Sequence, residues 1–193
     1  MLSPSVTTLL LEAREGSAEA LDRLLDQCGT RLLSLIRMRM GPKLRSKMES
    51  CDLLNATLLR AFKGFDSLEA QNTSSLMAWL ARIAENEIRD QAERLNAQRR
   101  DAAQEVPLDS GFHELADRVR SQTSRLILSE SRRKLERAIE QLPAEHREIV
   151  LLRHYEERGF KEIGARMGKS ADACRMLLAR ALTALTLKMR GPV

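Results

Sequence analysis

The sequence predicts an all-α protein: two small helical domains joined by an acidic linker, with a helix-turn-helix near the C-terminus. Leu, Ala, Arg and Glu dominate the 193 residues, aromatic residues make up 3%, and strand-like runs of Val, Ile, Thr and Tyr are missing. Apolar residues recur at three- and four-residue spacing, the period of a helix with one buried face. An acidic stretch separates two basic blocks. We expect domains over residues 5–100 and 126–190, with a flexible linker over residues 101–125.

The first block contains three predicted helices. The apolar face of the first, over Glu19–Leu35, consists of Leu21, Leu24, Leu25, Cys28, Leu32, Leu35 and Ile36. Gly41 and Pro42 break this helix. A second helix is predicted over Asp52–Phe65, and its periodic face consists of Leu53, Leu54, Thr57, Leu58, Ala61 and Phe62. After a polar, loop-like segment, a third helix begins near Ser74 or Ser75 and continues to about residue 100.

The segment between the blocks, Asp101–Asp117, has five acids and neither Lys nor Arg. Pro107 and Gly111 interrupt it, which is typical of a linker. Its negative charge between two basic blocks leaves two interpretations open, a solvated tether and a segment with a function of its own.

The last block predicts a helix-turn-helix. A helix lined by Leu135, Ile139 and Leu142 ends before Pro143, which suits the first turn of the next helix. Further along, the spacing of apolar residues predicts a short helix over residues 159–167. Small Gly164 in this helix permits another helix to cross closely. Gly168 suits the positive φ that ends a helix, and Ser170 can accept hydrogen bonds from the free amides of the next one.

The helix after Ser170 has a predicted buried face of Cys174, Leu177, Leu178, Ala181, Leu182 and Leu185. Its other face carries Asp172, Arg175, Met176 and Arg180, as in a recognition helix that enters a DNA groove. From Arg158 to Arg190 there are eight basic and two acidic residues, a net charge of +6, against +5 for the whole chain. This concentration of positive charge favours phosphate binding. The alternative is a helical hairpin with a solvated basic face.

Several classes of function lack a sequence signal. Three distant cysteines, Cys28, Cys51 and Cys174, argue against structural disulfides. We expect no metal site, no cofactor and no enzyme, since no metal-ligand spacing, glycine-rich phosphate loop or nucleophile motif occurs. No apolar run approaches the ~18 residues of a membrane span and no signal peptide is evident, so we expect a cytoplasmic protein without a membrane partner.

Both blocks resemble extracytoplasmic-function sigma factors of the sigma-70 family. Residues 135–153 are similar to region 4.1 and residues 159–181 to region 4.2. In the first block, Asp52–Phe62 is similar to region 2.2, and Ala78–Asn86, with Asp90 and Arg94, to regions 2.3 and 2.4. Two matches in the family's order, joined by a linker, make the resemblance specific.

The resemblance implies a promoter-specificity subunit with core RNA polymerase and promoter DNA as partners. It implies that region 2.2 docks on the polymerase β′ clamp through Asp52, Leu53, Asn55, Ala56 and Arg60. The implied contacts to the −10 element are Trp79, Arg82, Asn86, Arg89, Asp90 and Arg94. Region 4 would hold the β flap and read the −35 element through Lys161, Lys169, Ser170, Asp172, Ala173, Arg175, Met176 and Arg180. The acidic linker would run toward the RNA exit path.

The residue types suit these roles and also ordinary ones. Trp79 offers a stacking surface for an unstacked base, but a lone Trp in a helical domain is more often part of the core. Asn86 presents a donor and an acceptor to a base edge, and the arginines of the same helix are spaced to follow a phosphate backbone. A solvated face is the alternative, because acids interleave with these arginines as i,i+4 partners along the helix: Glu85, Glu87, Asp90 and Glu93. Arg175 is the best candidate for a guanine contact, whereas Lys161, Lys169 and Arg180 suit phosphates.

Two departures from the family are informative. Cys51 and Ala56 stand where the family usually has acids, and Asn55 stands for Gln. We hypothesise that a Ser/Thr kinase restores the charge at Ser50 or Thr57, since a phosphate adds about 1.5–2 negative charges; hydroxyls that cap or pack are the plain alternative. In the recognition helix, the family often has Thr, Ser and Arg at the positions of Ala173, Met176 and Leu177, so we expect a different −35 sequence, with thymine methyls as targets.

Two other functions stay open. One is a helix-turn-helix regulator that acts without core polymerase, with the N-terminal block as a sensor or dimerisation module. The other is an interaction protein that occupies the partners of sigma factors. An anti-sigma factor is a further expected partner of a sigma factor of this family.

Overall fold

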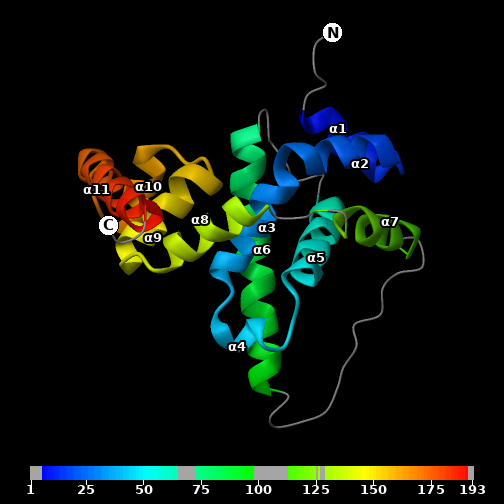
Figure 1. Cartoon of the computed structure of the whole chain (residues 1–193). Helices are drawn as coiled ribbons and strands as arrows, with labels where there is room; N and C mark the ends of the chain where they lie inside the picture. The colour runs from blue at the N-terminus through cyan, green and yellow to red at the C-terminus, as the bar shows by residue number, and fades with distance from the viewer. Residues whose placement is uncertain (1–5, 65–72, 98–112, 125, 127–128, 191–193) are drawn as a thin grey trace. The chain divides into compact units, whose positions relative to one another are not determined.

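The computed structural model describes residues 6–64, 73–97, 113–124, 126 and 129–190. Most of these residues are helical and none of them forms a strand, which confirms the all-α prediction for the described part of the chain. The chain divides into two compact units, Met1–Ile127 and Leu128–Val193 (Figure 1).

The N-terminal unit begins with α1 (Val6–Arg14) and α2 (Ala18–Leu24). Ser17 caps α2, because its hydroxyl accepts a hydrogen bond from the amide of Ala20 at 3.2 Å. A π-helical turn (Leu25–Gly29) continues α2 directly into α3 (Thr30–Arg39). The apolar face predicted here is confirmed, because all seven of its side chains are buried: Leu21, Leu24, Leu25, Cys28, Leu32, Leu35 and Ile36.

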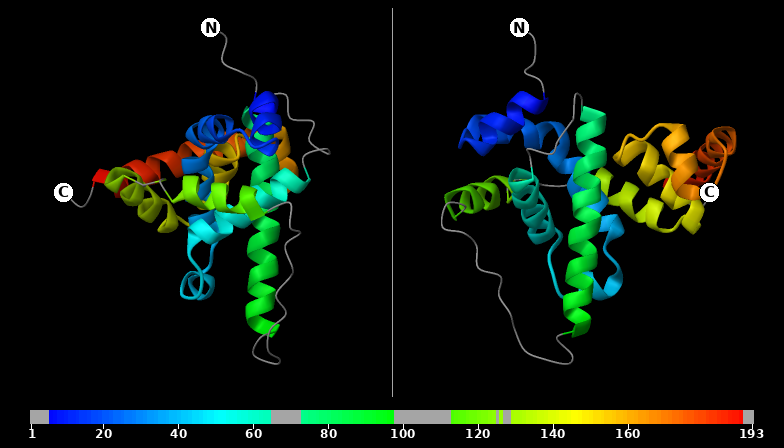
Figure 2. Two further views of the ribbon diagram at one scale, coloured as in Figure 1. Left: turned by 90° about the vertical axis from the view of Figure 1, so that its right-hand side faces the viewer. Right: turned by 180° about the vertical axis from the view of Figure 1, so that it is seen from behind.

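Pro42 occupies the first turn of a short helix, α4 (Pro42–Arg45), which confirms the predicted break after α3. Next come α5 (Ser50–Lys63) and the long α6 (Thr73–Ala97). α6 packs along α3 and α5 and forms the axis of this unit (Figure 2). The face predicted for α5 is buried at all six positions, Leu53, Leu54, Thr57, Leu58, Ala61 and Phe62. This packing leaves the opposite faces of α5 and α6 to solvent or to partners.

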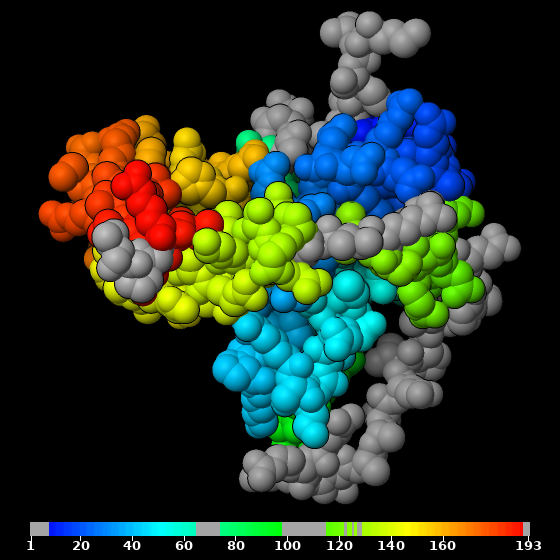
Figure 3. All heavy atoms as spheres, viewed as in Figure 1, coloured from blue at the N-terminus to red at the C-terminus, as the bar shows by residue number. Residues whose placement is uncertain are grey.

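The structure differs from the predicted linker in its last part. His113–Thr123 form helix α7, which belongs to the N-terminal unit and contacts α2 and α5 (Figure 3). Its buried side chains are Leu115, Ala116, Val119 and Thr123. They repeat at near-helical spacing, so this segment can bury an apolar face despite its acidic residues. Residues 101–112, which carry much of the predicted linker's negative charge, lie outside the described residues.

The C-terminal unit contains α8 (Glu130–Glu140), α9 (Ala144–Val150), a π-helical turn (Leu151–Tyr155), α10 (Phe160–Met167) and α11 (Ala171–Arg190). Ser129 caps α8 and accepts from the amide of Arg132 at 3.3 Å. α11 packs on α8, α9 and α10. Its buried side chains are Cys174 and Ala181, which are fully buried, and Leu185, which is 9% exposed. The prediction that Leu182 joins this core is wrong: it is 37% exposed, because it lies about 100° around the helix from Ala181.

Candidate nucleic-acid interface

The turn between α10 and α11 has the geometry of a helix-turn-helix. Gly168 ends α10 with φ +65°, which confirms its predicted left-handed conformation. Ser170 then accepts a hydrogen bond from the amide of Ala173 at 3.1 Å and so caps α11, as predicted. A Cβ added to Gly164 would lie 2.5 Å from the carbonyl oxygen of Lys169. Gly164 therefore allows a close approach, as predicted. The group that approaches it is the backbone of the turn, whereas the prediction was a crossing helix.

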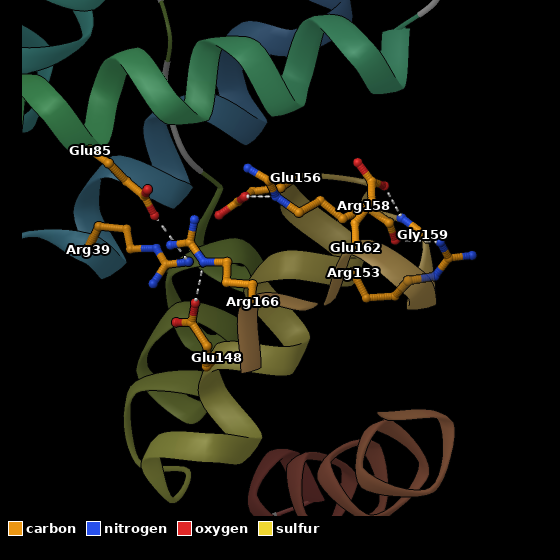
Figure 4. A network of polar contacts seen from close by, with 9 residues as sticks. All are labelled: Arg39, Glu85, Glu148, Arg153, Glu156, Arg158, Gly159, Glu162 and Arg166. Atoms are coloured by element: carbon orange, nitrogen blue, oxygen red, sulfur yellow. Dashed lines mark hydrogen bonds and ion pairs between the residues drawn. The ribbon is translucent and has the colours of Figure 1, made fainter. Parts of the chain in front are cut away.

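The start of α10 is held by polar contacts (Figure 4). The amide of Gly159 donates a hydrogen bond to Glu162 Oε2 at 2.8 Å, which closes the first turn of the helix. Just before it, Arg158 Nε donates to Glu156 Oε2 at 2.7 Å, and the Glu156 side chain is fully buried. Arg153 Nη1 donates to the carbonyl of Arg158 at 2.8 Å. These contacts fix the loop that leads into the helix-turn-helix.

The outer face of α11 carries the residues that the sequence assigned to DNA. Met176 is 59% exposed, and the other exposed members of that set on α11 are Asp172, Ala173, Arg175 and Arg180. Arg175 pairs with Asp172 through Nη1, and its guanidinium carbon lies 5.2 Å from the centre of the Phe160 ring. Met176 thus adds an apolar surface to a mostly polar face.

The flanking lysines differ in their surroundings. Lys161, on the first turn of α10, is exposed. Lys169, in the turn, is half-buried, and its Nζ lies 3.0 Å from Glu145 Oε1. Arg166, which is exposed, forms an ion pair with Glu148 at 3.5 Å. Two cations of the helix-turn-helix, Arg166 and Lys169, are therefore paired with acids of α9.

Residues 132–185 match the family described as Sigma-70, region 4. The C-terminal unit contains a sigma-70 region 4 domain. The match supports a member of the sigma-70 family, and such a domain implies sigma-factor-like recognition of a −35 promoter element, with core RNA polymerase and promoter DNA as partners. None of the curated proteins matches the chain. The region 4 match lies within the C-terminal unit, so it says nothing about residues 1–127.

In the N-terminal unit, the five residues predicted to contact the polymerase all lie on α5 but differ in how exposed they are. Asp52 and Arg60 are exposed, and Asn55 and Ala56 are half-buried. Leu53 is fully buried in the core, so its side chain is not available to a partner. Asn55 Oδ1 accepts a hydrogen bond from the hydroxyl of Thr123 on α7. Only part of this set therefore faces outward.

The residues assigned to the −10 element lie along α6. Arg82, Arg89 and Arg94 are exposed and Trp79 is half-buried, so Trp79 keeps both of its interpretations. Asn86 accepts a hydrogen bond from Arg89 Nη2 at 2.7 Å. These side chains occupy one helix, as predicted, but their roles stay predictions.

An ion-pair cluster that the sequence did not reveal joins α5 to α6. Arg60 Nη1 lies 2.8 Å from Glu87 Oε1 and 3.1 Å from Asp90 Oδ2. Glu87 is 7% exposed, so Arg60 neutralises a buried carboxylate. The i,i+4 pattern of charges suggested pairs within α6, whereas the packing of two helices decides the actual partner.

The phosphorylation hypothesis does not fit the structure. Thr57 is fully buried and its hydroxyl donates to the carbonyl oxygen of Leu53 at 2.6 Å, and Ser50 is 8% exposed. A kinase needs an accessible hydroxyl, and a doubly charged phosphate at Thr57 would be buried among apolar side chains. The Thr57 hydroxyl therefore packs in the core, which the sequence left as the alternative, and Ser50 is buried as well.

The cysteines and acids show no reactive or metal-binding arrangement among the described residues. Burial raises the pKa of Cys28 to about 12. Burial, with the nearby carboxylates of Asp52 and Glu49, also raises the pKa of the Cys51 thiol. No group of three or more His, Cys, Asp or Glu in the described ranges could hold a metal ion. None of the helices described has both the length and the apolar character required to cross a membrane.

Proposed function

We propose that this chain is a sigma factor of the extracytoplasmic-function type. It binds core RNA polymerase and directs promoter-specific initiation through the −10 and −35 elements. It acts by binding and has no catalytic role of its own. The region 4 match over residues 132–185 carries this proposal, because that domain implies −35 recognition on behalf of the polymerase.

The outer face of α11 supports the −35 half of the proposal. Arg175 is exposed near the start of the helix, where recognition helices contact base edges. Lys161, Lys169 and Arg180 would bind phosphates and set the register of the domain on the duplex. Met176, at 59% exposure, suits a thymine methyl.

The −10 and polymerase half rests on the resemblance of α5 and α6 to region 2. The exposed ends of the α5 surface, Asp52 and Arg60, would contact the β′ clamp together with Asn55 and Ala56. Arg82, Arg89 and Arg94 are exposed on α6, as cations that follow a phosphate backbone must be. Control by an anti-sigma factor stays a prediction, and we drop control by a Ser/Thr kinase at Ser50 or Thr57.

Transcription in vitro with core polymerase on a genomic library tests the proposal. We expect the full chain to produce discrete transcripts that core polymerase alone does not, with shared upstream sequences near −35 and −10. Arg175→Ala should reduce these transcripts, whereas Lys134→Ala, on the exposed face of α8, should not.

The second candidate is a DNA-binding regulator that works without polymerase. The helix-turn-helix geometry by itself supports it, since many regulators share this motif. Specific DNA binding by the chain, without transcripts from core polymerase and without binding to it, would replace the sigma-factor proposal by this one.

A further inference from the structure

The aromatic ring of Phe160 contacts the guanidinium groups of two arginines. The guanidinium carbon of Arg175 lies 5.2 Å from the ring centre and that of Arg153 lies 5.0 Å from it. Both distances are within the range of a cation–π interaction. Phe160 is the first residue of α10, and Arg175 lies on α11, so the ring connects the two helices of the motif.

The backbone on either side of the ring is fixed. Glu162 accepts from the amide of Gly159 at 2.8 Å, which holds the first turn of α10. Arg153 donates to the carbonyl of Arg158 at 2.8 Å, so this guanidinium is tied to the loop before Phe160. The ring itself is half-buried. Phe160 therefore presents a fixed surface to Arg175.

Arg175 has two restraints in the described structure, the ring of Phe160 and the carboxylate of Asp172. A long side chain that is unrestrained on a helix surface loses rotamer freedom when it binds, and this lost entropy weakens binding. A guanidinium that is held in advance loses less, and its planar fork can select one base through two hydrogen bonds. Asp172 lies on the same helix one turn earlier, so Phe160 is the restraint that comes from another element.

We propose that Phe160 is a positioning residue for Arg175, and that its ring sets how strongly the domain discriminates the base that Arg175 contacts. This inference rests on the proposed −35 recognition by α11. It assigns to Phe160 an effect on discrimination between sequences, with no effect on the general affinity for DNA. Phosphate contacts such as that proposed for Lys161 should show the reverse pattern.

The test measures dissociation constants of the full chain, assembled with core polymerase, for its preferred duplex and for single-base variants of that duplex. The preferred duplex is first selected with the wild type from a random pool. Phe160→Leu should lower discrimination at one base position by about two- to fivefold, the range of a partly exposed cation–π contact. Phe160→Tyr, which keeps the ring, should retain it. Lys161→Ala should weaken all duplexes alike.

A second readout concerns the free protein. In NMR spectra of the full chain, the ring of Phe160 should shift the side-chain protons of Arg175, and this shift should vanish in Phe160→Leu but remain in Phe160→Tyr. The assignment is overturned if Phe160→Leu keeps full discrimination, or if Phe160→Tyr loses as much as Phe160→Leu. Absence of any sequence preference in the wild type overturns the proposed −35 recognition, and this assignment with it.

A separate observation concerns α7. This helix buries Val119 fully and Thr123 to 1% exposure. The hydroxyl of Thr123 lies within hydrogen-bond distance of Asn55 on α5 and also of the carbonyl oxygen of Val119 on its own helix, at 2.9 Å. A second contact anchors the helix at its centre, where Arg118 donates to the carbonyl of Gly16. α7 therefore contacts Asn55, which is also one of the residues proposed to bind the polymerase.

From this contact we infer that α7 is an autoinhibitory cover of α5, which must leave before Asn55 can meet the polymerase. The inference rests on the proposed docking of α5. A partner that binds only the uncovered form has its apparent affinity reduced by the population of that form. Changes that release α7 should therefore strengthen polymerase binding.

Titration of fluorescently labelled full chain with core polymerase tests this. Val119→Asp places a charge in the buried face of α7 and should undock this helix, which should raise the affinity for core polymerase. If the covered form is about ten times more populated than the open form, the affinity should rise by about tenfold. Thr123→Val should raise it less, and Arg120→Ala, on the exposed side of α7, should leave it unchanged. Equal or weaker binding by both Val119→Asp and Thr123→Val overturns the cover. No binding by the wild type or by any variant overturns the proposed docking itself.

Discussion

Single residues decide the geometry of the helix-turn-helix. Gly164 admits the carbonyl of Lys169, Gly168 supplies a positive φ, and Ser170 caps the next helix. Each role depends on the backbone within a few residues, which is why sequence could predict two of them directly. The identity of the group that approaches Gly164 was not predictable, because it depends on how the turn folds back.

Gly164→Ala should destabilise the C-terminal unit by about 1–3 kcal/mol, since its Cβ would meet a backbone atom that must then shift. Urea unfolding of the full chain, followed by one probe in each unit, measures the change. Gly41→Ala is the matched control: an added Cβ there meets nothing within 4 Å, so a change within about 0.5 kcal/mol is expected. Equal effects of the two substitutions would contradict the packing explanation.

Arg175→Ala should cost about 1–3 kcal/mol at one base position of the preferred duplex and leave the other positions nearly unaffected. The physical reason is that a bidentate contact recognises one base, whereas a phosphate contact recognises none. Competition binding with each single-base variant measures this. Uniform weakening on every sequence would make Arg175 a phosphate contact.

At the scale of elements, packing between helices overrides patterns within them. The acids of α6 suggested pairs along the helix, but Glu87 and Asp90 both contact Arg60 of α5. The same holds for α7, whose composition indicated a linker and whose buried face joins it to α5 and α2. Partners of this kind are distant in sequence, so no local pattern reveals them.

Arg60→Met should lower the free energy of unfolding of the N-terminal unit by about 1–3 kcal/mol, because Glu87 would stay buried without its cation. Thermal or urea unfolding measures it. Arg82→Met, an exposed cation of α6, is the control and should change little. Adding Glu87→Gln to Arg60→Met should recover part of the loss; a double variant less stable than the single one would refute the pairing.

For the whole molecule, charge is concentrated at one end of the sequence. Residues 158–190 carry a net charge of +6, more than the +5 of the entire chain, so the remainder is slightly acidic. Affinity for DNA should therefore arise mainly from this segment and fall steeply with salt, because each phosphate contact releases counterions.

Lys161→Ala should reduce the slope of log affinity against log salt concentration by about 1, as expected for the loss of one phosphate contact. Titrations of the full chain at several salt concentrations measure the slope. Lys134→Ala, outside the helix-turn-helix, should leave it unchanged. A similar reduction in both variants would show that the slope reports total charge, and would remove Lys161 from the interface.

The sequence by itself determined the helical class, the breaks at Pro42 and Gly168, the buried face of α5 and the basic helix-turn-helix, because periodicity, caps and charge act over a few residues. Only the tertiary structure decided that α7 packs on α5, that Ser50 and Thr57 are buried, and that Phe160 meets Arg175. These outcomes depend on which faces meet after the chain folds. A helix exposes several faces with similar local chemistry, and the packing of distant segments selects which of them remains available to a partner.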